Sequence, residues 1–168
     1  MKTRNPTIIN KISAIIKKII FLFYMDPLSF LTHDPIVRAS ASTYNPTELQ
    51  RLGLQITLNL SNKKVRYLGE PTNPIYPDIV IWRPDFPNAN TGQAVIVELI
   101  ENPIFTYHGV ETWIRLNNTT GIKINLIVPV LQVNNAKAIM IKNNLNNIHL
   151  QTWNYEAGSG RYFFNTVT

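Results

Sequence analysis

The run Gln93–Ile100 (QAVIVELI) constrains the fold of this chain more than any other stretch of its sequence. Its β-branched and almost continuously apolar character is typical of a strand that is buried on both faces of a sheet. Such a strand needs a covering layer on each side, which helices supply in sheets of this kind. A second apolar run, Lys123–Val128 (KINLIV), has the same character. Together the two runs predict the centre of a sheet with helices on its faces.

Turn residues and helical spacing predict the order of the other elements. Asn45, Pro46 and Glu48 have the pattern of a helix start, so we expect a helix from there to about Leu60. The elements expected after it are strands at 64–68, 78–82 and 93–100, a helix at 107–117, a strand at 123–128, a helix from Asn134 or Asn135 to Asn144, and a strand at 148–155. Consecutive strands indicate a meander, and the segment 93–128 predicts a right-handed parallel crossover. The expected class is therefore α/β, with a mixed sheet flanked by helices.

The chain is long enough for one domain, and its flanks differ from that domain in composition. Its 168 residues, of which 45% are apolar, predict a single globular unit. We expect this domain at 45–156, after a loop or linker at 26–44 that is rich in proline and small polar residues. Residues 157–168 are expected to be a loosely held tail. Residues 1–25 predict an extra basic amphipathic helix or N-terminal extension.

The N-terminal segment holds most of the net charge of +6. Its basic residues are Lys2, Arg4, Lys11, Lys17 and Lys18, and it has no acid. The 11 basic and 10 acidic residues from Asp26 onward leave a net charge of only +1 for the rest. We expect a helix packed on the domain, or a start codon placed too early. A secretory signal and a helix lying on a membrane surface through residues 7–24 are the alternatives. The segment's uncharged stretch is shorter than the roughly 20 residues that span a bilayer.

Cysteine is absent from the chain, which excludes disulfides, thiolate zinc sites and a cysteine nucleophile. The three histidines are far apart in the sequence, so we do not expect a metal site built from histidines. A chain without cysteine fits a reducing compartment. We therefore expect a cytoplasmic protein, and no pattern calls for a small-molecule cofactor.

Two of the ten acids stand where packing does not explain them. Glu98 lies inside the apolar run 93–100, where a carboxylate is costly unless it has a cation, a basic partner or an open cleft. Asp78 follows Pro77 and opens the neighbouring strand. Carboxylates on adjacent strands can share Mg²⁺ or Mn²⁺, which take oxygen ligands. Such an ion can polarise a phosphodiester and generate hydroxide from a bound water.

The order of these features resembles the PD-(D/E)XK nuclease superfamily, which has the restriction-endonuclease-like fold. A helix with Glu48, a strand, Pro77-Asp78 at the next strand, Glu98 in a central strand, and then a helix and a strand follow one another over about residues 45–155. The resemblance implies that Asp78 and Glu98 bind a divalent metal. It also implies that Glu48 completes the site, and that the partner is a nucleic acid, DNA in the first instance.

One position departs from this family. The family's lysine, two residues beyond the second acid, is replaced here by Ile100. Residues i and i+2 share a face of a strand, so an apolar side chain stands where the family has an ammonium group. Arg115 and Lys123 are the candidates to replace it, although an arginine stays charged and is a poor proton acceptor. Glu111 lies four residues before Arg115 and can pair with it instead.

The densest basic and aromatic cluster after the N-terminal segment consists of Lys63, Lys64 and Arg66 with Tyr67. These residues, together with Lys123, are the predicted contacts to nucleic-acid phosphates. Lysines also protect a solvated edge strand from pairing with other chains, and this alternative remains open for the cluster.

Two functions of different classes follow from the sequence. The first is a Mg²⁺-dependent nuclease in which Asp78, Glu98, Glu48 and Arg115 form a variant PD-(D/E)XK site. The second is a domain of the same fold that lacks catalysis and binds nucleic acid or a protein, because a missing lysine is what the loss of catalysis would produce. Each acid also has a structural explanation: a strand-opening turn for Asp78, a strand edge for Glu98 and a helix cap for Glu48.

Overall fold

The computed structural model describes residues 27–85, 92–101 and 107–167. The chain divides into two compact units, Met1–Thr32 and His33–Thr168. The fold and the site below belong to the second unit. The predictions for residues 1–25, including a membrane-surface contact through 7–24, lie outside the described residues. Among the residues that are described, no helix has the length and hydropathy needed to cross a membrane.

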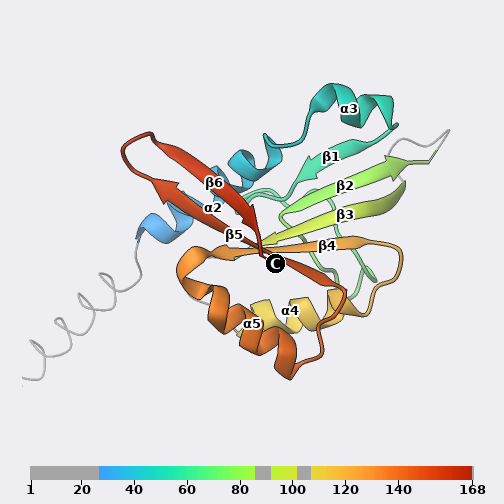
Figure 1. The fold of residues 1–168 in the computed structure, drawn as a ribbon. Helices are drawn as coiled ribbons and strands as arrows, with labels where there is room; N and C mark the ends of the chain where they lie inside the picture. The colour runs from blue at the N-terminus through green and yellow to red at the C-terminus, as the bar shows by residue number, and fades with distance from the viewer. Residues whose placement is uncertain (1–26, 86–91, 102–106, 168) are drawn as a thin grey trace, which may run out of the picture. The chain divides into compact units, whose positions relative to one another are not determined.

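A six-stranded mixed sheet forms the centre of the second unit (Figure 1). Its strands lie side by side in chain order: β1 Gln55–Leu58, β2 Ile79–Pro84, β3 Gly92–Ile100, β4 Lys123–Pro129, β5 Ile148–Glu156 and β6 Arg161–Thr166. The first three strands form an antiparallel meander, β3 to β5 are parallel, and β6 returns antiparallel to β5. The α/β class, the meander and the parallel crossover between β3 and β4 are confirmed.

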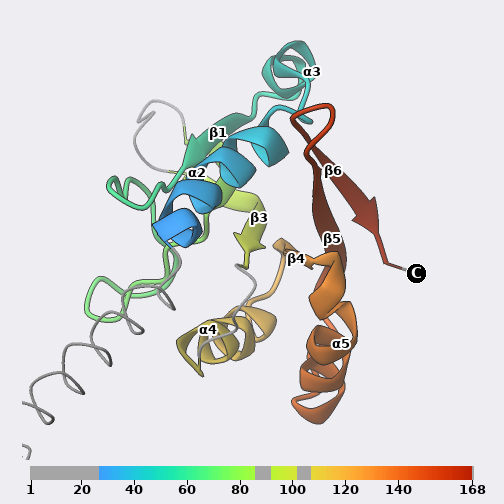
Figure 2. The same ribbon diagram turned by 90° about the vertical axis from the view of Figure 1, so that its left-hand side faces the viewer.

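Helices cover both faces of this sheet (Figure 2). Helix α2 (Pro27–Ala41), in its part from His33 onward, packs on one face, and the short helix α3 (Pro46–Arg51) adds Leu49 to the same core. Helices α4 (Tyr107–Asn117) and α5 (Val133–Lys142) cover the other face, and a 3-10 turn at Val130–Gln132 leads into α5.

The central strand β3 shows why two covering layers are needed. Successive side chains of a strand point to opposite faces of the sheet. Val97 and Leu99 therefore enter the core under α4, beside the fully buried Trp113. Ile100 enters the core under α2, together with Ile36. Glu98 lies on this second face as well, so its carboxylate is directed toward α2.

The prediction of a loop or linker at 26–44 is wrong, because residues 27–41 form helix α2. Proline and small polar residues suggested a loop, and Pro35 does lie inside the helix. Ile36 and Val37 follow Pro35 and have no exposed surface. Burying two β-branched side chains on the sheet contributes about 2 kcal/mol each, which offsets much of the cost of an internal proline.

The predicted helix at 45–60 is also too long. Helix α3 ends at Arg51, and Gly53 then adopts a left-handed φ of +66°, which turns the chain into β1. The predicted strand at 64–68 is absent, since only the isolated bridges Leu60–Lys63 and Leu68–Ile75 occur between β1 and β2. The first strand of the meander is therefore β1, which the helix prediction had covered.

Two smaller predictions near the C-terminus need correction. The described part of the expected tail, residues 157–167, is not loose, because Arg161–Thr166 form β6 and pair with β5 along its outer edge. Trp153 of β5 contacts Tyr162 of β6 with ring centroids 6.1 Å apart, which explains why the hairpin is held. Helix α5 begins at Val133 after Gln132, which makes no side-chain cap, so Asn134 and Asn135 do not start it.

Candidate functional site

The two acids singled out by the sequence lie on neighbouring strands, as predicted. The backbone N–H of Asp78 donates to the carbonyl of Glu98 over 2.9 Å, just before β2 begins. Ile79, and not Asp78, is the register partner of Glu98, because Asp78 comes before the first residue of β2. The two carboxylates are hydrogen-bonded to different partners, and each therefore has to be considered by itself.

Glu98 is enclosed by donors from three parts of the domain. Its side chain is only 3% exposed. The hydroxyl of Ser40 in α2 donates to Oε2 over 2.6 Å, and the hydroxyl of Tyr44 donates to Oε1 over 2.5 Å. Asn125 of β4 donates its Nδ2 to Oε1 over 3.3 Å. Both oxygens of Glu98 thus accept hydrogen bonds from the protein, which is how a buried carboxylate is stabilised.

Tyr44 and Asn125 are affected by this enclosure. Burial raises the pKa of the Tyr44 phenol, and the charge and hydrogen bond of Glu98 raise it further. The phenol therefore acts as a hydrogen-bond donor at all physiological pH values. Asn125 is 3% exposed, and its Oδ1 is a buried atom without a hydrogen-bond partner among the described residues. The network is consequently rich in donors around Glu98 and leaves one acceptor unsatisfied.

Asp78 closes the end of the central strand. Its Oδ2 accepts a hydrogen bond from the backbone N–H of Ile100 over 2.7 Å, and its Oδ1 lies 3.0 Å from Nε2 of His33 in α2. Asp78 is 9% exposed, so both contacts are shielded from water. This side chain joins the start of β2, the end of β3 and the first covering helix.

His33 lies between two acids. Its Nδ1 is 3.1 Å from Oδ1 of Asp34, which also accepts from the backbone and the hydroxyl of Ser61. Burial by itself lowers the pKa of His33, but the hydrogen bonds and charges of Asp78 and Asp34 outweigh it, so the pKa is raised above 6.5. The Ser61 bonds and the histidine lower the pKa of Asp34 despite the opposing effect of burial. A charged imidazolium is therefore favoured here.

A third carboxylate, Glu101, completes this group at the end of β3. Burial raises the pKa of Glu101, the charge of Asp78 raises it further, and the Trp113 hydrogen bond and the charge of His33 oppose the increase. The indole Nε1 of Trp113 donates to Oε1 over 2.6 Å. A Cβ added at Gly109 would lie 3.1 Å from the same oxygen, so the helix approaches Glu101 closely at a glycine. We refer to His33, Asp34, Asp78 and Glu101 as the strand-end cluster.

The arrangement does not fit a Mg²⁺ or Mn²⁺ site shared by Asp78 and Glu98. Magnesium in proteins needs carboxylate oxygens that remain open to the ion and to several waters. The oxygens of Glu98 are turned toward Ser40, Tyr44 and Asn125 instead. Among residues 33–85, 92–101 and 109–167, no three histidine or acidic side chains gather into a group that could hold a metal ion.

The side chain in the family's lysine position is part of the core. Ile100 is 4% exposed and packs with Ile79 and Ile127 under α2. An ammonium group could not enter this position without losing that packing. The departure from the family pattern is therefore built into the fold.

The structure does not bring Glu48 or Arg115 to the two acids. Glu48 is exposed on α3 and pairs with Arg51 over 2.6 Å, while Asn45 alone caps the helix. Arg115 donates to the carbonyl of Asn73 over 2.5 Å and makes no ion pair with Glu111. Both residues have structural partners, but these differ from the helix cap and the Glu111 pair that the sequence had suggested.

The predicted nucleic-acid contacts fall in two places, the loop between β1 and β2 and the start of β4, and they differ in exposure. Lys63 and Lys64 are exposed in the loop between β1 and β2, and Lys123 is exposed at the start of β4. The guanidinium of Arg66 instead stacks on the ring of Trp82, with its Cζ 3.4 Å from the centroid. Burial lowers the pKa of Arg66, and the charge of Asp85 opposes this. Arg66 is therefore a packing residue as well as a cation.

A buried asparagine organises the loop that carries these lysines. Asn59 has no exposed surface, and its Oδ1 accepts from the backbone N–H groups of Val65 and Arg66. Its Nδ2 donates to the carbonyls of Arg66 and Pro77. Four hydrogen bonds from one side chain replace the strand pairing that the sequence had suggested for 64–68.

Sequence reasoning missed most partners of the two acids. His33, Ser40 and Tyr44 belong to or follow a helix that was expected to be a loop. Asn125 had a signal of the kind that identified Glu98, since it is a polar residue inside an apolar strand. In the sheet, β3 and β4 place Glu98 and Asn125 directly side by side. A search for polar residues at matching positions of the two buried strands would have found the pair.

Comparisons of the chain with protein-family models, with curated proteins and with solved structures find no match.

Proposed function

We propose that this domain binds nucleic acid, and that Asp78 and Glu98 stabilise its fold instead of holding a catalytic metal. The observation that carries the proposal is the enclosure of Glu98, whose two oxygens accept hydrogen bonds from Ser40, Tyr44 and Asn125 at 3% exposure. A carboxylate in this state contributes to stability and offers no free oxygen to an ion.

The order of elements supports a nuclease-like domain without that chemistry. A helix, a three-stranded meander with Pro77-Asp78 before its second strand, Glu98 in the third strand, and a helix followed by a parallel strand repeat the order on which the resemblance to the PD-(D/E)XK superfamily rests. In this reading the chain retains the acids of the family as internal hydrogen-bond acceptors. Ile100 in the core is consistent with the loss of the catalytic lysine.

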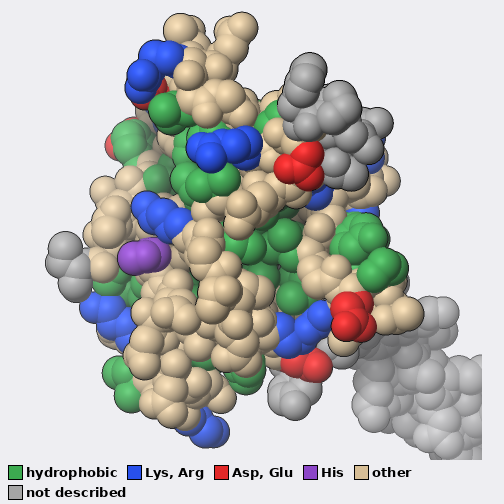
Figure 3. Space-filling model, turned by 90° about the vertical axis from the view of Figure 1, so that its right-hand side faces the viewer, with side chains coloured by type: hydrophobic (Ala, Val, Ile, Leu, Met, Phe, Trp, Pro, Cys, Tyr) green, Lys and Arg blue, Asp and Glu red, His purple; other side chains and the backbone are tan. Residues whose placement is uncertain are grey.

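Charge distribution supports nucleic acid as the partner. From His33 onward the chain has 11 lysines and arginines and 9 acids, and none of the basic residues is buried. Two of the acids, Asp78 and Glu98, are buried, which leaves 11 basic against 7 acidic groups that are exposed or partly exposed. Figure 3 shows lysine and arginine side chains spread over the face that it presents. A dispersed positive surface is suited to phosphate contacts that do not depend on base sequence.

The test is binding of the full chain to a short labelled DNA duplex and to the matching RNA, measured by fluorescence anisotropy over a range of salt concentrations. We expect the double variant Lys63→Gln, Lys64→Gln to reduce the slope of log K against log salt by about 2, because each phosphate contact contributes about 0.9. The matched control is Lys137→Gln, Lys142→Gln on α5, which removes the same charge. Equal effects of the two variants, or no binding by the wild type, would contradict the proposal.

A metal-dependent nuclease is the second candidate, and one observation favours it. The charge of Asp78 raises the pKa of Glu101, which means that two carboxylates lie close enough to repel each other at the end of β3. A divalent ion at this point would relieve the repulsion and would use Asp78 with Glu101 instead of Glu98. Titration of Mn²⁺ into the full chain, followed by calorimetry, tests this idea. Binding that is lost in Asp78→Asn and Glu101→Gln but kept in Glu98→Gln would favour the nuclease, as would a metal-dependent cleavage product.

A further inference from the structure

We propose that the pocket between the α4–β4 and α5–β5 loops binds a phosphate group. The pocket has a volume of about 370 Å³ and lies at the start of the parallel strands β4 and β5. It is distinct from the strand-end cluster, because β3, β4 and β5 run in the same direction and the cluster lies where β3 ends. Its polar lining consists of Thr119, Thr120, Lys123, Asn146, Asn147 and His149.

The charge of the lining is suited to an anion. Lys123 supplies a full positive charge and His149 a second group that can donate, while the described residues that line the pocket include no aspartate or glutamate. Lys123 is exposed and makes no ion pair with any described acid. The register of β4 with β5 places Asn125 opposite His149, and Lys123 lies two residues before Asn125. Lys123 and His149 therefore extend from the same face of the sheet toward the same pocket.

The frame of the pocket is fixed by hydrogen bonds of Thr119 and Asn147, which leave the side chains of Thr120, Lys123, Asn146 and His149 available. Asn147 donates its backbone N–H to Oδ1 of Asn117 over 3.0 Å and its Nδ2 to the carbonyl of Asn117 over 2.8 Å. The hydroxyl of Thr119 donates to the carbonyl of Leu116 over 2.7 Å. The two bonds between Asn147 and Asn117 join the α5–β5 loop to the end of α4. A pocket whose walls are already ordered loses little conformational entropy when an anion binds.

Four polar side chains of the lining are available to a ligand because they make no hydrogen bond with the described residues. Among the hydrogen bonds of the described residues, none involves the side chains of Thr120, Lys123, Asn146 or His149. Such side chains on a fixed frame offer a hydroxyl, an ammonium, an amide and an imidazole to one oxygen-rich group. A phosphate accepts several hydrogen bonds at once. Its negative charge can also pair with Lys123, which has no ion pair with a described acid.

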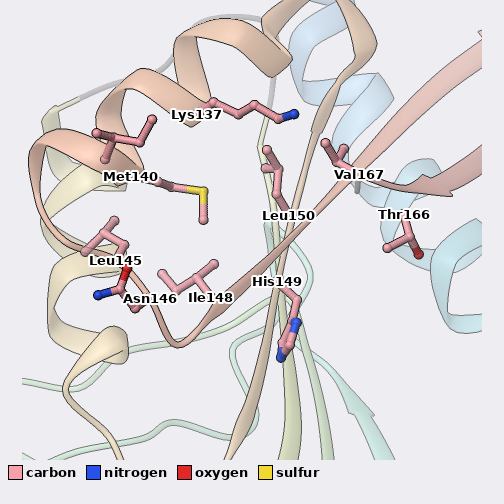
Figure 4. Close-up of a pocket in the computed structure, with 10 residues that line it drawn as sticks. Lys137, Met140, Leu145, Asn146, Ile148, His149, Leu150, Thr166 and Val167 are labelled. Carbon is pink, nitrogen blue, oxygen red and sulfur yellow. The ribbon is translucent and has the colours of Figure 1, made fainter.

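A neighbouring apolar hollow limits where the phosphate can bind. It has about 360 Å³ and shares Asn146 and His149 with the polar pocket. Figure 4 shows Met140 of α5 facing Ile148 and Leu150 of β5 across this hollow, with Val167 beyond them. Its walls are mostly aliphatic and would not solvate an anion. The phosphate is therefore assigned to the polar pocket, and only a larger ligand could extend an apolar part into the hollow.

A phosphate site in this pocket would extend the proposed function. Only the possibility that the phosphate belongs to a nucleic acid rests on that proposed function. A phosphate monoester, such as a free nucleotide, and the phosphodiester backbone of a nucleic acid present the same oxygens. The first measurement uses inorganic phosphate, titrated into the ¹⁵N-labelled full chain at constant pH and ionic strength. We expect saturable shifts of the backbone amides of Gly121, Lys123, Asn146 and His149, and small shifts elsewhere.

Variants of the lining residues test whether phosphate binds in this pocket. Lys123→Gln is expected to weaken phosphate binding about tenfold, while Lys142→Gln, which removes the same charge from α5, leaves it unchanged. Thr120→Ala and Asn146→Ala are expected to weaken binding by smaller factors, and thermal unfolding checks that each variant is folded. Equal weakening by the two lysine variants, or shifts that do not saturate or that scatter over all lysines, would overturn the inference.

Competition and affinity measurements identify whether the phosphate belongs to a nucleic acid or to a free nucleotide. If a DNA duplex and inorganic phosphate compete, and Lys123→Gln weakens both, the pocket holds a backbone phosphate. If a mononucleotide binds more tightly than phosphate and the duplex does not bind, the pocket is confirmed as a phosphate site while the proposed nucleic-acid function fails. If the duplex binds but phosphate causes no saturable shift, the function stands and this pocket is overturned as the site.

Discussion

The two ends of the parallel strands use polar side chains in opposite ways. Where β3 ends, the carboxylates of Asp78 and Glu101 accept hydrogen bonds from the protein, and Glu98, two residues before that end, is enclosed by three donors. Where β4 and β5 begin, Lys123 and His149 lie at a pocket, and their side chains make no hydrogen bond or ion pair with the residues that the structure describes. Polar groups that are already satisfied contribute to stability, whereas groups that are exposed and unpaired are available to a ligand.

This comparison of the two strand ends changes what the acids Asp78 and Glu98 indicate about function. The acids at the first end have the residue types of a metal site, but Asp78, Glu98 and Glu101 all accept hydrogen bonds from the protein. The lysine at the second end was a substitute for a missing catalytic group, and it lies instead beside threonine, asparagine and histidine. The ability of a site to bind a ligand depends on which polar side chains have no partner in the folded protein.

The largest effect is expected from removing Glu98. Glu98→Ala leaves the buried donors of Ser40, Tyr44 and Asn125 without an acceptor, and we expect it to lower the free energy of unfolding by about 3 kcal/mol. The corresponding decrease in Tm is roughly 6–12 °C for a chain of this size. Urea unfolding measures the change. The control Glu48→Ala removes an exposed carboxylate and is expected to leave stability unchanged, so an equally small effect of Glu98→Ala would contradict the enclosed state.

A smaller loss is expected from removing a single donor. Tyr44→Phe and Ser40→Ala each delete one short hydrogen bond to Glu98, and we expect each to cost about 1–2 kcal/mol. Because all of these groups share one network, the loss in the double variant Glu98→Ala, Ser40→Ala should be less than the sum of the single losses. Strict additivity in urea unfolding would show that the donors act independently of Glu98.

The strand-end cluster predicts a pH dependence of stability. The folded pKa of His33 is raised above its unfolded value of 6.5, so its contribution is fully present below that value and is lost as pH rises through the folded pKa. The raised pKa of Glu101 acts in the same direction at lower pH, and the lowered pKa of Asp34 acts in the opposite direction below 3.8. We expect the unfolding free energy to fall as the pH rises above 6.5, and His33→Gln to remove this slope. A slope that persists in the variant would assign it to another group.

The smallest effect on stability is expected at the opposite end of the strands. Lys123→Gln removes a cation that pairs with no described acid, so the free energy of unfolding should change by less than about 0.5 kcal/mol. The same variant is expected to weaken phosphate binding, which separates the two ends by function and stability. A loss of stability as large as that of Tyr44→Phe would mean that Lys123 is structural after all.

The extent to which the sequence predicted the fold differs between strands and helices. The apolar runs of β3 and β4 were predicted almost to the residue, because burial on both faces leaves a continuous signal. Helix α2 was missed, since its proline and small polar residues indicate a loop unless Ile36 and Val37 find a sheet to cover. β1 and β6 are edge strands with weak patterns, and their pairing depends on the neighbours that they meet.

The sequence by itself determined that Glu98 is unusual and that Asp78 lies next to it on the neighbouring strand. It also determined the mixed α/β sheet, because alternation and apolar runs are local properties of the chain. Only the tertiary structure decided what satisfies the carboxylates, since Ser40 and Asn125 are 58 and 27 residues away from Glu98 in the chain. It likewise decided that Lys123 and His149 share a pocket, because hydrogen bonding and charge pairing depend on distances in space that spacing in a sequence does not encode.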